Sequence, residues 1–400
     1  MTRTEIVDAA FKVWGRNFYR KTSLSQLAKE LGVSKPALYR HFENKQALTD
    51  AMTESFLDDF AGSIRADFER AQQIQDADEG IFTIIRSIAD FFARNAFALL
   101  FSLINIYDRK LDGHAISERL RHRGVDIGTL MRIIEKKYDV DRPIVQLIFA
   151  TLTFFMAYFH RTENSHKKPP GEEKIQYIIS AICKIIENGL GYSIKKIDGF
   201  NFEELEARVG APLYAEGEPL FKAVAEAVAE AGPWDASMEM VARRLGLSKS
   251  SLYGHFKNKK DMLRRLFSGE FRRIIEFARQ GIRLSDVSEE QLYLGIFSIT
   301  IYFRSHPEFL TAIDWIRTRK LDLGKPERKT DIFRLFEDVD IEPLRGFTED
   351  EKLRSSHWIL FLLINILTQP GRNEKRGDTK NSDTRLLFRF ITLGLGCFIR

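Results

Sequence analysis

The sequence predicts an all-α fold built from two copies of one unit. Apolar residues recur every three or four positions, as at Ile6, Ala10 and Val13, whereas the alternation typical of β-strands is scarce. The chain has only 11 prolines, and most of them lie where predicted helices end. A segment near the N-terminus also recurs roughly 200 residues later, which indicates an internal duplication.

The composition is that of a folded helical protein. A chain of 400 residues suits two domains or two pairs of domains, and 44% hydrophobic with 29% charged residues excludes a disordered chain. Cys183 and Cys397 lie far apart, which favours reduced thiols over a disulfide framework. The longest apolar stretch, Trp358–Leu367, is roughly half as long as a membrane crossing requires. We therefore expect a cytoplasmic protein without a membrane segment, and the net charge of +5 permits nucleic-acid binding.

The duplication is clearest in one window of each half. Ser23–Lys45 reads SLSQLAKELGVSKPALYRHFENK, and Ser237–Lys259 reads SMEMVARRLGLSKSSLYGHFKNK, with about half of the positions identical. Two shorter motifs recur in the same order further along each half. They are RKLD at Arg109–Asp112 and Arg319–Asp322, and GLG at Gly189–Gly191 and Gly394–Gly396.

These matches divide the chain into five predicted parts. Each copy should contain a small N-terminal domain followed by a larger helical domain for effector binding and association. A segment rich in Gly, Pro and charge separates the copies and is interpreted as a linker. The parts are the N-terminal domains 1–48 and 219–261, the helical domains 49–192 and 262–400, and the linker 193–218.

Each repeated window has the pattern of two short helices joined by a tight turn. In the first copy, Ser23 can cap a helix, and Gln26 completes a capping box. Gly32 can adopt the left-handed conformation that a tight helix exit requires. Ser34 can cap the second helix, in whose first turn Pro36 is tolerated. Two such helices, the second with polar residues exposed at its N-terminal end, form the helix-turn-helix that enters a DNA major groove.

The string LGVSKPALYRHFENKQAL resembles the N-terminal signature of the tetracycline-repressor (TetR) family, and LGLSKSSLYGHFKNKKDM resembles it a second time. The L-Y-x-H-F-x-x-K core is specific, and its occurrence at corresponding places in both halves strengthens the resemblance. The signature covers about 50 residues per copy. The resemblance implies a DNA-binding transcriptional regulator, by family expectation a repressor.

The residues expected to contact DNA lie on and around the second helix of each window. Lys, Tyr and His side chains there can reach phosphates or base edges, and a Lys at the start of the next helix can reach a further phosphate. Arg40 becomes Gly254 in the second copy, so we expect the second unit to bind more weakly or to read a different half-site. The candidates are Ser34, Lys35, Pro36, Tyr39, Arg40, His41 and Lys45, and Ser248, Lys249, Ser250, Tyr253, His255 and Lys259.

The covalent duplication predicts an unusual assembly. TetR-like proteins are typically homodimers that place two reading helices in successive major grooves. Here one chain carries both, so we expect a monomeric pseudo-dimer that binds an imperfectly palindromic double-stranded operator. The alternative is a homodimer of tandem chains with four reading helices.

Dense aromatic residues in the first helical domain leave two interpretations open. They could line a pocket for a small apolar effector that releases the operator, as in family members. They could equally fill the hydrophobic core, which is the usual place of a buried Phe. The pocket candidates are Phe92, Phe101, Phe155, Tyr158 and Phe159.

Other chemistries find little support in the residue patterns. His114 with His122, and His160 with His166, lack the spacing of a zinc site, so no metal site is predicted. No nucleophile elbow or phosphate-binding loop occurs, and we expect neither a cofactor nor enzymatic activity. The alternative hypothesis is a small-molecule-binding or enzymatic helical protein that keeps degenerate helix-turn-helix units as a scaffold.

Overall fold

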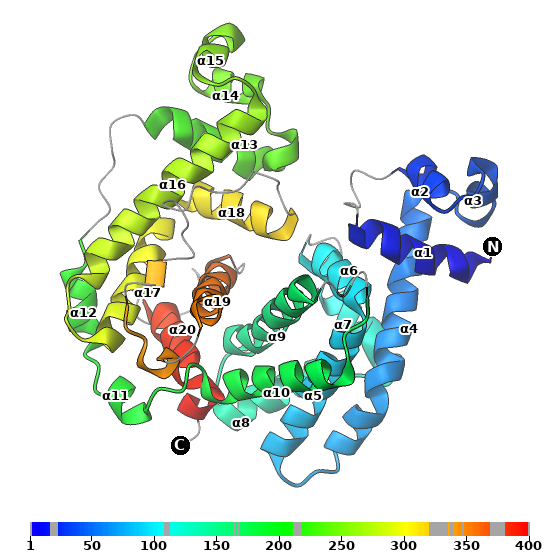
Figure 1. Ribbon diagram of the computed structural model, residues 1–400, viewed down its shortest axis with the longest axis horizontal. Coiled ribbons are helices and arrows are strands. Elements are labelled where there is room, and N and C mark those ends of the chain that lie inside the picture. The colour runs from blue at the N-terminus through cyan, green and yellow to red at the C-terminus, as the bar shows by residue number, and fades with distance from the viewer. Residues whose placement is uncertain are drawn as a thin grey trace. The chain divides into compact units, whose positions relative to one another are not determined.

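The computed structural model of the chain is helical in the residues that it describes, which contain no β-strand. The all-α prediction is therefore confirmed. The chain forms two compact units, residues 1–184 and 185–400 (Figure 1). Lys320–Asp322 and Arg109–Asp112 of the RKLD motif lie outside the described residues. The described residues are 2–16, 23–107, 113–163, 165, 168–210, 218–319, 335–336, 339–345, 348–368 and 381–398.

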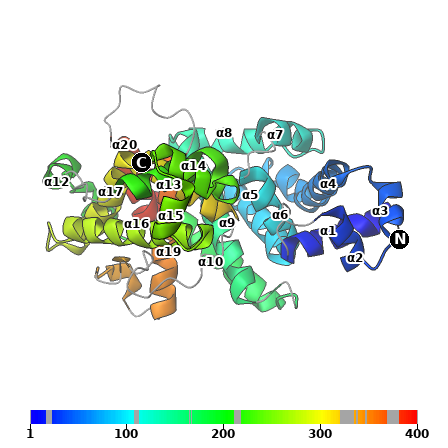
Figure 2. The same cartoon turned by 90° about the horizontal axis from the view of Figure 1, so that it is seen from above.

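The first unit begins with a cluster of three helices at the N-terminal end of a long helix. In both views α1, α2 and α3 gather beside the start of α4 (Figures 1 and 2). Helix α5 then packs along α4, and α6 and α9 pack on α5. The helices are α1 (Arg3–Arg16), α2 (Leu24–Glu30), α3 (Lys35–His41), α4 (Lys45–Ala71), α5 (Ala77–Arg94), α6 (Ala96–Tyr107), α7 (Gly113–Arg121), α8 (Ile127–Tyr138), α9 (Arg142–Thr162) and α10 (Glu172–Asn188).

The contact between α4 and α5 is a continuous apolar seam. Ile81, Ile85 and Ile88 recur at helical spacing on α5 and are at most 3% exposed. They lie in the same core as Ile64 and Phe68 of α4, which are equally buried. Burial of each such side chain contributes roughly 1.5–3 kcal/mol, and together these side chains are sufficient to hold the two helices together.

Helix α9 is the one described helix that is long and apolar enough to cross a membrane. Its most apolar stretch is 61% buried within the protein, as expected for a core helix. Val145, Leu147 and Ile148 are fully buried there. The apolar stretch Trp358–Leu367 forms part of another helix, α19.

The second unit repeats the arrangement. Helices α13, α14 and α15 form the cluster at the start of the long helix α16, along which α17 packs. The boundary between the two units falls inside α10. The helices are α11 (Ile194–Asp198), α12 (Phe202–Arg208), α13 (Glu218–Asp235), α14 (Met238–Arg244), α15 (Lys249–His255), α16 (Lys259–Ile282), α17 (Ser288–Ser305), α18 (Pro307–Arg319), η4 (Glu342–Leu344), α19 (Glu349–Leu367), α20 (Ser382–Leu393) and η5 (Gly394–Phe398).

Much of the predicted linker is folded onto the second unit. Residues 194–208 form α11 and α12, which contact α20 and α17 respectively (Figure 1). Ile197 and Leu205 are at most 2% exposed, so both helices bury an apolar side chain. Asp198 also accepts a hydrogen bond from Arg389 of α20 at 2.7 Å. Two packed helices therefore stand between residues 194 and 208, where the sequence predicted a linker. Residues 211–217 of the predicted linker lie outside the described residues.

Candidate nucleic-acid interface

The first helix of the repeated window begins and ends as its sequence predicts. Ser23 Oγ accepts from the Gln26 amide at 3.1 Å, while Gln26 Oε1 accepts from the Ser23 amide at 2.8 Å. This reciprocal pair satisfies two backbone donors that the first turn leaves without partners. Beyond α2 the chain turns at Gly32, whose φ of +65° is a conformation that glycine adopts at little cost.

The second helix of the window, α3, is fixed by one cap and two buried side chains. Ser34 Oγ accepts from the Ala37 amide at 3.2 Å. Leu38 is fully buried and Phe42 is 1% exposed, so one face of α3 packs against the rest of the cluster. The opposite face is therefore presented to solvent as a rigid surface.

The predicted contact residues of the first copy lie on that solvent-facing surface. Lys35, Pro36, Arg40 and His41 are all exposed, and Ser34 is exposed at the cap. The bulky apolar ring of Tyr39 is 43% exposed, and the Lys35 ammonium lies 6.0 Å from the centre of that ring. The placement agrees with the prediction, while contact with DNA remains a proposal.

The second copy repeats this geometry. Gly246 has a φ of +65°, and Ser248 Oγ accepts from the Ser251 amide at 3.1 Å. Leu252 is fully buried and Phe256 is 2% exposed, as in the first copy. The predicted residues Lys249, Ser250, Tyr253 and His255 are exposed, and the Tyr253 side chain is 48% exposed.

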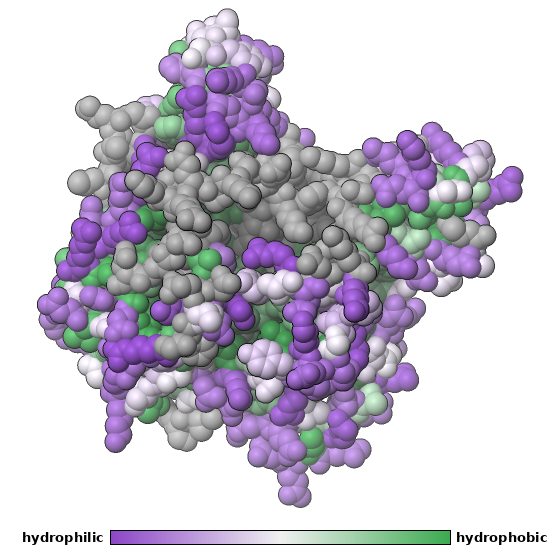
Figure 3. Space-filling model, in the orientation of Figure 1, coloured by the Kyte–Doolittle hydropathy of each residue, from purple (hydrophilic) through white to green (hydrophobic). Residues whose placement is uncertain are grey.

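Two substitutions change the exposed face of the second copy. Gly254 replaces Arg40, and no atom lies within 4 Å of where its Cβ would be, so this position opens to solvent. Ser250 replaces Pro36, and its Oγ lies 3.2 Å from the Oγ of Ser248. The second copy thus lacks the guanidinium that Arg40 exposes in the first copy, and it exposes a hydroxyl group where the first copy has Pro36. In Figure 3 the end occupied by α15 is paler than the purple surface below it, which agrees with this composition.

A lysine opens the long helix in each copy. Asn44 caps α4 and Asn258 caps α16, and each side-chain oxygen accepts from the amide three residues ahead at 2.9 Å. Lys45 and Lys259 therefore start their helices in the same way, and both are half-buried. Burial lowers the pKa of Lys259, an effect that the carboxylate of Asp235 opposes.

The five aromatic pocket candidates lie in packed parts of the first unit. Phe101, Phe155 and Phe159 are between 6% and 9% exposed, and Phe92 and Tyr158 are half-buried. The Phe101 and Phe92 rings contact Phe56 and Phe60 of α4, at 5.8 Å between centroids in both cases. These contacts support the packing interpretation, and none of the five residues lines the cavity described next.

The histidines considered for metal binding have other surroundings. His160 is 8% exposed, and its Nε2 donates to the carbonyl oxygen of Phe92 at 2.7 Å. Burial lowers its pKa, so the neutral ring of a core histidine is favoured. His122 is exposed, and the side chains of His114 and His166 lie outside the described residues. Within the described part of the chain no group of His, Cys, Asp and Glu could hold a metal ion.

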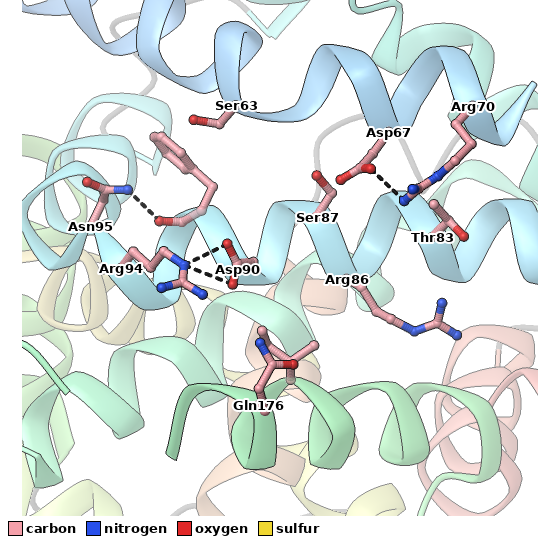
Figure 4. A pocket seen from close by; sticks show the side chains of 12 residues that line it. Ser63, Asp67, Arg70, Thr83, Arg86, Ser87, Asp90, Arg94, Asn95 and Gln176 are labelled. Atoms are coloured by element: carbon pink, nitrogen blue, oxygen red, sulfur yellow. Dashed lines mark hydrogen bonds and ion pairs between the residues drawn. The ribbon is translucent and has the colours of Figure 1, made fainter. Parts of the chain in front are cut away.

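A polar cavity of about 470 Å³ lies between α4, α5 and α10 of the first unit (Figure 4). Arg94 of α5 donates from Nε to both carboxylate oxygens of Asp90 and pairs with Glu172 of α10 at 2.9 Å. Figure 4 shows Arg86 directed away from the Asp90–Arg94 pair. Sequence reasoning missed this cavity, because its residues come from three helices and share no motif. Its lining is Ser63, Asp67, Arg70, Thr83, Arg86, Ser87, Asp90, Phe91, Arg94, Asn95, Gln176 and Ile179.

The duplicated window matches a known family twice. The model for bacterial regulatory proteins of the tetR family matches residues 6–52 and again residues 220–266. The fold and the two matched windows thus define an all-α chain with two helix-turn-helix domains. Each copy begins with a TetR-family N-terminal domain, and the chain is a tandem duplication.

Several relatives carry similar sequences. The HTH-type transcriptional repressor KstR2 of Rhodococcus jostii is 33% identical over 16% of this chain and 31% of its own length. The HTH-type transcriptional repressor ComR of Escherichia coli is 28% identical over 30% of this chain and 57% of its own length. The chain therefore spans about a third to somewhat more than half of these relatives. The crystal structure of the TetR family regulator PfmR from Thermus thermophilus is 22% identical, with a TM-score of 0.34, over 45% of this chain and 95% of PfmR.

Proposed function

We propose that the protein is a DNA-binding transcriptional regulator, acting as a repressor, with two covalently linked reading helices. The observation that carries this proposal is that both copies keep the same capped turn and the same solvent-facing Lys, Tyr and His. A scaffold has no physical need to keep these side chains exposed twice. Ser34, Lys35, Tyr39, Lys45 and their counterparts would bind phosphates and base edges of a double-stranded operator.

The operator should be an imperfect palindrome bound by one chain. Because α3 exposes Arg40 where α15 has Gly254, the two half-sites should differ at the base pairs that these positions face.

An effector would act through the first unit. The polar cavity offers three guanidinium groups, two carboxylates and several hydroxyl and amide groups. A small polar molecule therefore fits this lining better than the apolar effector expected from the aromatic residues. Its binding would change operator affinity by a coupling free energy on the order of 1–3 kcal/mol.

The experiment is selection of binding sites from random duplex DNA by the full chain, followed by measurement of the complex mass at fixed salt concentration. An asymmetric sequence with two half-sites, bound by one chain, supports the pseudo-dimer. A symmetric sequence bound by two chains supports the homodimer of tandem chains. If no sequence is enriched, DNA reading is wrong, and the scaffold alternative predicts small-molecule binding without DNA.

A further inference from the structure

The long helices α4 and α16 can be compared residue by residue. His41–Lys45 and His255–Lys259 share the same residue at four of five positions, and an Asn caps the long helix in both copies. The register then continues without a gap, because residues buried in α4 correspond to residues buried in α16. Leu48 and Met262 are one such pair, and Ile64 and Ala278 are another, each fully buried.

The charge of these two corresponding helices is opposite. Helix α4 contains three basic and six acidic residues, whereas α16 contains seven basic and three acidic residues. The difference is concentrated on positions that are exposed in both copies. The exposed pairs are Glu43 and Lys257, Gln46 and Lys260, Asp50 and Arg264, and Asp58 and Arg272.

A buried carboxylate organises the basic side of α16. Asp261 is 7% exposed and accepts hydrogen bonds from Arg264 at 2.9 Å, from Arg265 at 3.3 Å and from the backbone amide of Lys257 at 3.2 Å. The hydrogen bond from Arg264 in particular holds the pKa of Asp261 below its usual range. Ala47 holds the corresponding place in α4 and offers no such anchor.

The acidic side of α4 already has partners within the first unit. Glu54 accepts hydrogen bonds from Arg119 and, at 2.5 Å, from Arg123. Asp58 accepts from Arg123 at 2.6 Å. These pairs join α4 to α7 and to Arg123, the second residue after α7, so this side of α4 serves packing within the unit.

Only three residues, Phe256–Asn258, separate the reading helix α15 from the first turn of α16. Lys257 precedes α16, Lys260 lies in its first turn, and Arg264 follows one turn later on the same row. At 1.5 Å per residue, Arg264 lies about 8 Å along the helix from Lys259, and Arg272 lies about 12 Å beyond Arg264. A side chain in contact with a phosphate acts at short range, because the Debye length is about 8–10 Å at physiological salt. Arg272 therefore has the same charge on the same row but lies further from α15.

We propose that Lys257, Lys260 and Arg264, here called the basic flank, bind phosphates of duplex DNA beside the half-site read by α15. The first copy has no equivalent, because Glu43, Gln46 and Asp50 stand there. The second copy therefore supplies the larger share of the electrostatic affinity, whereas the change from Arg40 to Gly254 alone predicted a second unit that binds more weakly or reads a different half-site. The basic flank rests on the proposed DNA binding, and it identifies the second copy as the one that anchors the chain on DNA.

The test measures Kd of the full chain for its selected operator between 50 and 200 mM salt. Each lost phosphate contact lowers the slope of log K against log salt by about 0.9. The triple variant Lys257→Gln, Lys260→Gln, Arg264→Gln should therefore lower the slope by about 2 to 3 and weaken binding about tenfold or more at 100 mM salt. Arg264→Lys keeps the charge and should restore most of the slope that Arg264→Gln removes.

The matched control is Arg272→Gln, which removes one charge from the same helix row. It should change Kd by less than about twofold. Equal effects of Arg264→Gln and Arg272→Gln would show that only net charge matters and would overturn the basic flank. An unchanged slope in the folded triple variant, checked by circular dichroism, would overturn it as well. If the unaltered chain binds no duplex, the proposed function itself is wrong and the basic flank falls with it.

Discussion

Gly189 and Gly394 approach each other so closely that neither position has room for a side chain. A Cβ atom on Gly189 would lie 2.6 Å from the backbone nitrogen of Gly394, and one on Gly394 would lie 2.5 Å from the nitrogen of Gly189. Both residues have positive φ, +58° and +61°. Backbone hydrogen bonds join the same strip of chain, from Leu190 to Ile391 at 2.8 Å and from Tyr192 to Thr392 at 3.1 Å.

The first prediction concerns that contact. Gly189→Ala would place a Cβ atom 2.5 Å from the carbonyl oxygen of Ile391 and would also strain a positive φ. Overpacking costs about 1–3 kcal/mol and the left-handed backbone about 1–2 kcal/mol, so we expect a loss of about 3 kcal/mol in the free energy of unfolding. Urea unfolding followed by circular dichroism measures this loss.

Gly191→Ala is the matched control for that measurement. Gly191 also has positive φ, +89°, but no atom lies within 4 Å of its Cβ position. It should therefore show only the backbone cost of about 1–2 kcal/mol. If the two alanine variants are equally destabilised, the close approach of Gly189 and Gly394 makes no contribution to stability.

The second prediction concerns the segment between the copies. Glu206 of α12 is 8% exposed and accepts hydrogen bonds from Arg385 at 2.7 Å, Tyr293 at 2.5 Å and Asn381 at 2.6 Å. Glu206→Gln removes the carboxylate that accepts hydrogen bonds from the half-buried Arg385 and leaves only the exposed Glu203 as its anionic partner, so we expect a loss of about 2 kcal/mol in the unfolding transition of the second unit. Glu203→Gln changes an exposed partner of the same Arg385 and should cost less than about 0.5 kcal/mol.

The Glu206 contribution should also depend on pH. Burial alone would raise the pKa of Glu206, but the hydrogen bonds from Arg385, Tyr293 and Asn381 outweigh it, and the pKa lies below its ordinary value of 4.5. The stabilisation is then complete above about pH 5 and is lost as pH falls through the folded-state pKa. Calorimetry between pH 7 and pH 3 should show wild type and Glu206→Gln converging towards acid. A constant difference across that range would contradict the assignment.

The helix-turn-helix could be predicted from sequence because every determinant is local. The Ser23–Gln26 box and the Ser34 cap each join residues three positions apart, and the Gly32 turn depends on one residue, so each feature is visible in the chain. Their repetition in the second copy then identified the unit twice. The solvent-facing surface of α3 followed from the apolar spacing that buries Leu38.

The features that sequence reasoning missed depend on contacts between distant residues. Glu206 binds Arg385, 179 positions further on, and Arg94 binds Glu172, 78 positions further on. A Gly- and Pro-rich composition indicates a linker whether or not short helices within it pack on the rest of the protein. The packing of α12 on α17 could therefore not be predicted from the composition. The many aromatic residues near Phe101 were compatible with a ligand pocket and with a hydrophobic core. Only contacts such as that between the Phe101 and Phe56 rings distinguish the two interpretations.

The third prediction tests the exposed tyrosines. Tyr39→Ala and Tyr253→Ala should each weaken binding to every duplex sequence about threefold to tenfold, because a phosphate hydrogen bond contributes about 1 kcal/mol and carries no sequence information. Tyr177 is a suitable control because it is an exposed tyrosine, at 69%, on α10. Anisotropy titrations with specific and random duplexes make the comparison. An equal loss in Tyr177→Ala would show that the effect is not local to the reading helices.

The fourth prediction separates reading from anchoring within the first copy. Lys35 stands in the first turn of α3, where side chains reach base edges, whereas Lys45 opens α4. Lys35→Ala should therefore relax the preference at one base step, and Lys45→Ala should weaken all sequences uniformly. Repeating the site selection with each variant distinguishes the two. A uniform loss in Lys35→Ala would assign that lysine to a phosphate instead.

The fifth prediction uses a buried thiol next to the glycine contact. Cys397 is 8% exposed, burial raises its pKa to about 12, and its Sγ donates to the carbonyl oxygen of Gly394 at 3.0 Å. The reactive thiolate is therefore rare at pH 8, whereas Cys183 is half-buried and should react first with a disulfide reagent. Peptide mass spectrometry over time gives both rates.

The labelling rate of Cys397 also reports on the contact between Gly189 and Gly394 when it is measured in the two glycine variants. Gly189→Ala disturbs the strip of backbone against which Gly394 packs, so it should raise the labelling rate of Cys397 well above that of Cys183 in the same sample. Gly191→Ala should leave the order of labelling unchanged, because its side chain would meet no neighbour. If Cys397 reacts as fast as Cys183 in the unaltered chain, η5 is accessible to the reagent and the contact between Gly189 and Gly394 does not protect Cys397.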